Sequence, residues 1–142
     1  MSSMSPMPVS RTPAELLDRR RQVILDGDAE GFAALFAPDA VIDMPFEGTP
    51  DASLRIEGQE AIREYAQRMM NSPVRIEEFD VTALHQTQDS EVLVVEMRTI
   101  GTVTTTGKPF SVTSVQILHL RDGLITLFRA YGDPRVLAQA GR

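Results

Sequence analysis

The stretch Asp39-Ala40-Val41-Ile42-Asp43-Met44-Pro45-Phe46 marks the change from helix to strand in this chain. A helical pattern ends at Pro38, and apolar residues then surround the Asp43 carboxylate, with no basic residue next to it. Burial among apolar groups raises the pKa of a carboxyl group, and such shifted groups cluster at functional sites. We therefore expect Asp43 to face a pocket and to act as an acid or base near neutral pH.

Two helices are predicted before this strand. The sequence Thr12-Pro13-Ala14-Glu15 has the pattern of a capping box with proline in the first turn, which predicts a helix to about Leu25. Asp28 is a typical cap for a second helix, which is expected to end near Ala37. Residues 1–11 are interpreted as a disordered tail, which leaves one domain over residues 12–142.

The sequence after this strand predicts one more helix and a series of strands. Residues 47–53 are rich in Gly, Pro, Asp and Ser and are interpreted as a loop, and Gly58 precedes a third helix. Strands are expected over 74–88, 91–105, 109–121 and 124–131, with a hairpin at Asp122-Gly123. This order predicts an α+β fold, in which three helices from the N-terminal half wrap a curved antiparallel sheet around a cone-shaped cavity.

Composition narrows the possible functions of the 142-residue chain. The net charge of -6 argues against a nucleic-acid partner, and no apolar run approaches the roughly 18 residues of a membrane span. The absence of cysteine removes thiolate chemistry and fits a reducing cytoplasm. His85 and His119 lack the spacing of metal ligands, so no metal site is expected.

Several segments resemble the SnoaL-like branch of the nuclear transport factor 2-like superfamily, over nearly the whole chain from Thr12 to Ala138. They are Asp26-Gly27-Asp28, Leu35–Val41, Ile56–Ile62, Leu120–Ile125 and Phe128–Tyr131. The resemblance implies the cone-shaped fold, a hydrophobic small-molecule ligand, and a homodimer formed through the outer face of the sheet. That outer face is expected to carry Val95, Met97, Val115, Ile117 and Leu127.

Two relatives give residue correspondences for catalysis. Ketosteroid isomerase uses a first-helix tyrosine and two aspartates, and the corresponding residues here are Arg20, Met44 and Gln116. Limonene epoxide hydrolase has Asn-Met-Pro where this chain has Asp43-Met44-Pro45, and its arginine corresponds to Arg98. The catalytic residues of the isomerase are therefore absent. Of the epoxide hydrolase's catalytic residues, only those that position the water have counterparts here.

Catalytic acids of the relatives are missing at two further positions. The two catalytic aspartates of limonene epoxide hydrolase correspond to Ile100 and Ala130. Phenazine-biosynthesis proteins place a glutamate near Ala130 and a histidine near Tyr65. The superfamily also contains binders without catalytic activity, so the resemblance predicts the fold better than the function.

A set of site residues follows from the resemblance. We expect Asp43 to be the general base or acid, with Arg98 and Gln116 stabilising negative charge on a substrate oxygen. Arg98 and Glu96 lie on the same face of their strand, so if this face lines the cavity, both side chains point into it. The alternative is a structural ion pair within the sheet. Arg20 either guards the pocket mouth or leaves its head in water. The expected substrate contacts are Arg20, Met44, Phe46, Tyr65, Met69, Glu96, Ser114 and Phe128.

The expected function is cofactor-independent tailoring of a small molecule in secondary metabolism, including antibiotic biosynthesis. The reaction would be of the polyketide cyclase or isomerase type, with proton transfer next to a carbonyl. Two alternatives stay open. One is an epoxide hydrolase or epoxide-opening cyclase in which Asp43 activates water or a hydroxyl. The other is a non-catalytic binding or scaffold protein, which an Asp43 facing solvent would favour.

Overall fold

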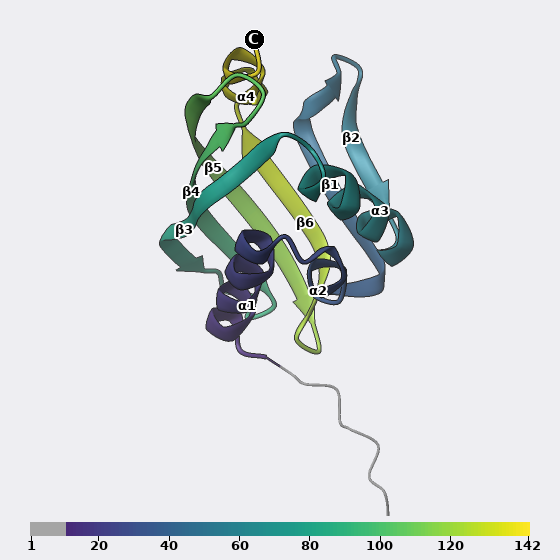
Figure 1. The fold of residues 1–142 in the computed structure, drawn as a ribbon. Coiled ribbons are helices and arrows are strands. Elements are labelled where there is room, and N and C mark those ends of the chain that lie inside the picture. Colours follow the sequence, from purple (N-terminus) through teal and green to yellow (C-terminus); the bar gives the residue numbers. More distant parts are fainter. Residues whose placement is uncertain (1–10) are drawn as a thin grey trace, which may run out of the picture.

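A computed structural model describes residues 11–142, so the expected tail lies outside the described residues except for Arg11. The described part contains α1 (Pro13–Asp26), α2 (Ala29–Ala33), α3 (Gln59–Met70) and α4 (Pro134–Ala140). Its strands are β1 (Phe36–Thr49), β2 (Ala52–Glu57), β3 (Val74–Gln86), β4 (Val92–Val103), β5 (Lys108–Arg121) and β6 (Leu124–Gly132). The predicted α+β class is confirmed, with α1, α2 and α3 in the N-terminal half (Figure 1).

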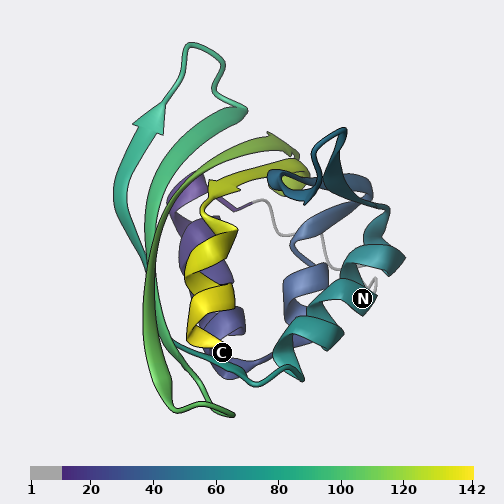
Figure 2. The ribbon, with the colours of Figure 1, turned by 90° about the horizontal axis from the view of Figure 1, so that it is seen from above.

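The strands form one six-stranded sheet in the order β2-β1-β6-β5-β4-β3. Four of the five pairings are antiparallel, but β1 and β6 run parallel. The sheet is therefore mixed rather than wholly antiparallel as predicted, because the chain crosses from β1 through α3 and the meander before it returns beside β1. Seen from above, the sheet bends around α1 and α4, and α3 lies on the far side of the concavity (Figure 2).

Local sequence signals set two of the boundaries. Thr12 and Glu15 form the predicted capping box, with each side chain bonded to the backbone N–H of the other. Gly27 ends α1 in the left-handed region, at φ 67°. Asp122 and Gly123 also have positive φ, at 54° and 77°, as a two-residue hairpin turn requires. The predicted start of α1 and the β5–β6 hairpin are both confirmed.

Three elements differ from prediction. The second helix ends at Ala33 rather than Ala37, because the Leu35 carbonyl accepts a hydrogen bond from Ile125 N and the chain joins the sheet. Residues 52–57 form the edge strand β2, so the expected loop shrinks to a turn between paired strands. The helix α4 was not predicted, although Asp133 caps it and Pro134 occupies its first turn.

The main core lies between the concave face of the sheet and the helices. On β4, Leu93, Val95 and Met97 are each at most 1% exposed and point into this core. The expectation that Val95 and Met97 belong to the outer face is wrong, because strand alternation turns the neighbouring Glu96 and Arg98 outward instead. On β5, Val115 is 39% exposed and does lie on the outer face.

Candidate functional site

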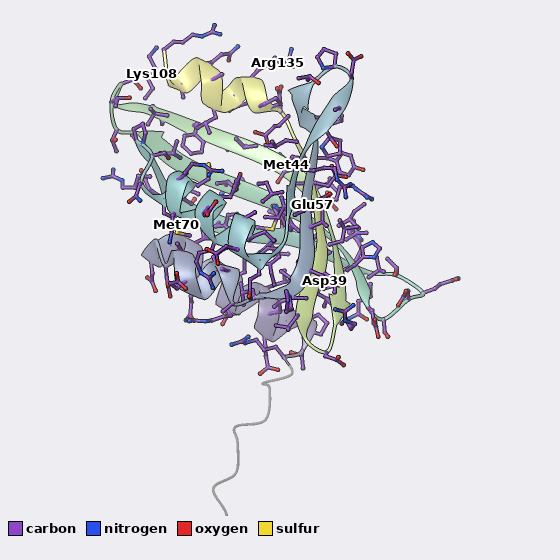
Figure 3. All side chains as sticks on the ribbon, turned by 90° about the vertical axis from the view of Figure 1, so that its right-hand side faces the viewer. Asp39, Met44, Glu57, Met70, Lys108 and Arg135 are labelled. Carbon is purple, nitrogen blue, oxygen red and sulfur yellow. The ribbon has the colours of Figure 1, made fainter. Side chains whose placement is uncertain are left out.

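A mostly apolar cavity of about 330 Å³ lies between the helices and the sheet. Of the expected substrate contacts, it is lined by Met44, Tyr65, Met69 and Phe128. Met44 on β1 and Met70 on α3 are labelled in Figure 3, and both belong to its wall. The other lining residues are Ile24, Leu25, Asp26, Gly27, Phe32, Ile42, Ala66, Val74, Arg75 and Ile76. This composition suits a hydrophobic ligand that carries a few polar atoms.

Tyr65 brings a hydroxyl into the cavity wall, where it lies 3.9 Å from the Met44 sulfur. Burial raises the pKa of Tyr65 to about 12, and the Glu47 carboxylate adds to this effect while Arg68 opposes it. The phenol is therefore neutral at pH 7 and is available as a hydrogen-bond donor. Asp26 and Arg75 supply the charged groups of the lining.

Arg20 is 1% exposed and lies against the core rather than in water. Its guanidinium carbon is 5.1 Å from the centre of the Phe79 ring and 5.6 Å from that of Phe128. Nη2 contacts the Met97 sulfur at 3.5 Å, and Nε and Nη1 have no hydrogen-bond partner among the described residues. Burial lowers the pKa of Arg20 to about 10, so the side chain stays charged at neutral pH. The interpretation that its head lies in water is wrong, because α1 presents this side chain to the concave face.

Gln116 lies on the same inner face and is 6% exposed. Its Oε1 is buried without a hydrogen-bond partner in the described part of the chain. Met97 pairs with Ser114, and Phe128 pairs with Leu118. Met97 and Phe128, which both contact Arg20, therefore lie at strand positions on either side of Gln116. The guanidinium therefore lies above this part of β5, and Phe128 forms the boundary between it and the cavity. Ser114 shares the Gln116 face but does not line the cavity.

Asp43 lies between Ile42 and Met44, which both line the cavity, so its side chain points to the opposite face. Its Oδ2 accepts a hydrogen bond from Arg129 Nε at 3.0 Å, whereas Oδ1 is buried without a partner among the described residues. The nearby Ser53 hydroxyl, followed by the Arg129 guanidinium, holds the pKa of Asp43 below its ordinary value against the raising effect of burial. The predicted raised pKa and cavity-facing position are both wrong.

Three other expected site residues lie outside the cavity. Arg98 and Glu96 are on the outward face of β4, with side chains 54% and 48% exposed. Arg98 faces Glu78 at 3.9 Å, and Glu96 contacts His85 at 2.7 Å, so the alternative of ion pairs within the sheet describes their position. Phe46 is 62% exposed and packs edge-on against Tyr131. The expectation that Arg98, Glu96 and Phe46 line the cavity is wrong, because the apolar residues of β4 take the inner face and the pairing of β1 becomes irregular after Met44.

Sequence reasoning missed the polar groups at the cavity margin. Asp26 and Arg75 line the cavity, and Glu47 acts electrostatically on Tyr65. A signal for Glu47 was present, since Pro45 and Gly48 enclose it and such residues mark irregularities in strands. Within residues 11–142, no group of three His, Asp or Glu side chains is placed to hold a metal ion. No helix of the same part is long and apolar enough to cross a membrane.

Comparison with known proteins places the chain in a family. The protein YesE of Bacillus subtilis (strain 168), which is uncharacterized, is 28% identical over 128 residues, 89% of this chain and 84% of that protein. A crystal structure of a Bacillus subtilis protein superposes with a TM-score of 0.83 at 26% identity, covering 92% of this chain and 94% of the other.

A second solved structure is the Δ5-3-ketosteroid isomerase of a Mycobacterium species. It has a TM-score of 0.69 at 25% identity and covers 87% of this chain and 93% of its own. The SnoaL-like domain family matches residues 18–128, which is most of the chain. The chain therefore belongs to the SnoaL-like domain family, within the nuclear transport factor 2-like fold.

Proposed function

We propose that this protein is a small-molecule isomerase or cyclase that moves a proton next to a substrate carbonyl. The observation that carries the proposal is the buried Arg20 guanidinium, which has two nitrogens without partners among the described residues. Arg20 lines a neighbouring cavity of about 370 Å³ and contacts Phe128 in the wall of the apolar cavity. A buried charge without a counterion is costly, and ionisable groups that burial perturbs strongly cluster at functional sites. A substrate oxygen that gains negative charge would supply the missing partner.

The chemistry follows from this placement. Removal of a proton from the carbon next to a carbonyl leaves the C–H electron pair in a new C=C bond and moves the carbonyl π electrons to oxygen. Arg20 and the amide of Gln116 then donate hydrogen bonds to the enolate oxygen. Return of the proton to another carbon of the conjugated system completes an isomerisation. Attack of the enolate carbon on a second carbonyl, whose oxygen takes the proton, completes a cyclisation instead.

The comparison with ketosteroid isomerase supports these roles. In that enzyme, a tyrosine and a protonated aspartic acid donate hydrogen bonds to the developing oxyanion. The corresponding residues here are Arg20 and Gln116, which are also donors, so the proposal keeps the function of those positions while the side chains differ. Met44 stands where the isomerase has its base, and Asp43 points away from the cavity, so the base must come from another part of the wall.

The apolar lining favours a hydrophobic carbonyl compound, and family membership favours a polyketide-like substrate of secondary metabolism. The proposed reaction uses only side chains of this chain. The outer face of the sheet, where Val115 is exposed, fits the homodimer that the resemblance implies. An epoxide substrate is less well supported, because Asp43 is the water-positioning residue of that scheme and it lies outside the cavity.

The proposal is tested by hydrogen–deuterium exchange of 2-tetralone, an apolar bicyclic ketone, followed by NMR in D2O. The wild type is expected to exchange the protons next to the carbonyl faster than buffer does. Arg20→Met should lower the enzymatic rate by about 10²–10³-fold, the usual effect of losing one oxyanion donor. The control Arg121→Met removes an exposed arginine that pairs with Asp39, and it should retain the wild-type rate.

Two results would contradict the proposal. Exchange no faster than in buffer, combined with stabilisation of the protein by 2-tetralone, would identify a binding protein without catalytic activity. Equal rates in Arg20→Met and wild type would show that the guanidinium does not act on the carbonyl. Circular dichroism of each variant separates loss of fold from loss of the donor.

A further inference from the structure

The end of β1 changes phase just after Met44. Pairing with β2 is regular up to Met44 and resumes only at Gly48, where φ is 104°. Met44 lines the cavity, yet Phe46, two residues on, packs against Tyr131 on the outer side. Regular alternation would place Met44 and Phe46 on one face, so the irregularity between them reverses the faces. Irregularities of this kind re-aim side chains and are frequent next to active sites.

The reversal places Glu47 on the cavity side of β1. Because Phe46 points outward, its neighbour Glu47 points inward beside Met44. The electrostatics agree with this placement, because the Glu47 carboxylate contributes to the raised pKa of Tyr65, whose side chain belongs to the cavity wall. Glu47 is exposed and is not one of the residues that line the cavity, so its carboxylate lies at the cavity mouth rather than inside.

Glu47 has the properties of a free carboxylate. It takes part in no ion pair and no side-chain hydrogen bond within residues 11–142, in contrast to Asp43, which is held by Arg129. Neighbouring protein atoms partly withdraw water from it, and this burial raises the pKa of Glu47. A carboxylate without an ion-pair partner is free to accept a proton and to return it.

The position of Glu47 relative to the oxyanion donors suits a bound ketone. Gln116 pairs with Ala130 on β6, and Arg129, the residue before Ala130, pairs with Asp43, the residue before Met44. Gln116 and Met44 therefore lie two strands apart, which is about 10 Å at the usual strand spacing. The small side chain of Ala130 lies between them, and Glu47 approaches from the Met44 side.

We propose that Glu47 is the general base of this site, carried into the cavity mouth by the irregularity between Met44 and Gly48. A Glu47 oxygen takes the proton from the carbon next to the substrate carbonyl, and the resulting enolate oxygen is held by Arg20 and Gln116. The Glu47 carboxylic acid then gives the proton to carbon or oxygen of the product, which restores the carboxylate. This inference rests on the proposed function and names the residue that its proton transfer requires.

The placement of Glu47 is tested first, without any substrate, by ultraviolet titration of tyrosinate. The chain has two tyrosines, so a Tyr131→Phe background reports Tyr65 alone. In that background, Glu47→Gln should lower the pKa of Tyr65, because a negative charge that disfavours tyrosinate is removed. The matched control is Glu64→Gln, an exposed acid on α3 next to Tyr65 in sequence, and it should leave the titration unchanged. Equal titrations in Glu47→Gln and its parent would overturn the placement.

The catalytic role is tested with the same 2-tetralone exchange. Glu47→Gln should reduce the rate at least about 100-fold, the lower end of general-base contributions, whereas Glu64→Gln retains it and Glu47→Asp recovers part of it. Retention of the rate by Glu47→Gln while Arg20→Met loses it would overturn the Glu47 assignment and leave the proposed function standing. Loss in Asp26→Asn instead would assign the base to Asp26. A wild type that exchanges no faster than buffer would overturn both the function and its base.

Discussion

The two faces of the sheet bury opposite charges in opposite ways. On the inner face, Arg20 is 1% exposed and has two nitrogens without partners in the described chain. On the outer face, Asp43 is 7% exposed and accepts a hydrogen bond from Arg129 at 3.0 Å. Both charges are buried, but only the outer one has a counterion. The comparison teaches that the pairing of a buried charge, rather than its burial, separates a candidate ligand site from a structural ion pair.

The largest expected loss of stability comes from breaking the outer pair. Asp43→Asn removes the counterion of Arg129, whose side chain is 32% exposed. Because partial exposure lets water compensate, we expect a loss of about 2 kcal/mol, less than for a fully buried pair. The free energy of unfolding in urea, compared between Asp43→Asn and wild type, measures this loss. Asp39→Asn on the same strand breaks an exposed pair with Arg121 and should cost about 0.5 kcal/mol or less.

The catalytic activity of Asp43→Asn tests the same comparison. The 2-tetralone exchange rate of Asp43→Asn should equal that of the wild type after correction for the folded fraction, because the carboxylate lies outside the cavity. A large loss of exchange in a fully folded Asp43→Asn would place Asp43 in the chemistry and would contradict the separation of the two faces.

The outer pair also predicts a pH dependence. The folded-state pKa of Asp43 lies below its ordinary value, so its contribution to stability is fully present above the unfolded-state pKa of about 3.9. It is lost as the pH falls through the folded-state pKa. The stability difference between wild type and Asp43→Asn should therefore be constant near neutral pH and shrink in acid. A difference that grows on acidification would show that the pair does not stabilise the ionised carboxylate.

The smallest effect is expected at Arg98. Its side chain is 54% exposed and lies 3.9 Å from Glu78, so Arg98→Met should change the free energy of unfolding by about 0.5 kcal/mol or less. The exchange rate should not change. Loss of exchange would restore Arg98 to the catalytic role that the sequence resemblance implied, and it would mean that the outer face takes part in the site.

Much of the fold could be predicted because its signals are local. The capping box at Thr12 and the turn at Asp122-Gly123 each act within a few residues, so the sequence specifies them directly. Tertiary contacts decided the remaining elements. The second helix stops early because Leu35 bonds to Ile125 on β6, and the edge strand β2 exists because residues 52–57 pair with β1.

Which residues belong to the candidate site depends on which face of the sheet each strand residue points to, and this was harder to predict. Ile42, Asp43 and Met44 are all buried, so the burial pattern does not alternate and does not show which face of the sheet Asp43 is on. The contact with Arg129 places Asp43 on the outer face. The β4 strand did carry a signal, since Leu93, Val95 and Met97 alternate with the charged residues Glu96 and Arg98. Pro45 and Gly48 indicate an irregularity near Glu47, but the side on which Glu47 lies depends on how the pairing between β1 and β2 is shifted.

The central claim is that the sheet's inner face retains an unpaired cation for a ligand, and the most direct test is the unfolding free energy of Arg20→Met without ligand. Burial lowers the pKa of Arg20, so the charged form destabilises the folded state at neutral pH. The variant should be more stable than wild type by about 1–3 kcal/mol in urea unfolding, while its 2-tetralone exchange falls. A variant that is less stable than wild type would mean that Arg20 supports the fold, and it would contradict the account.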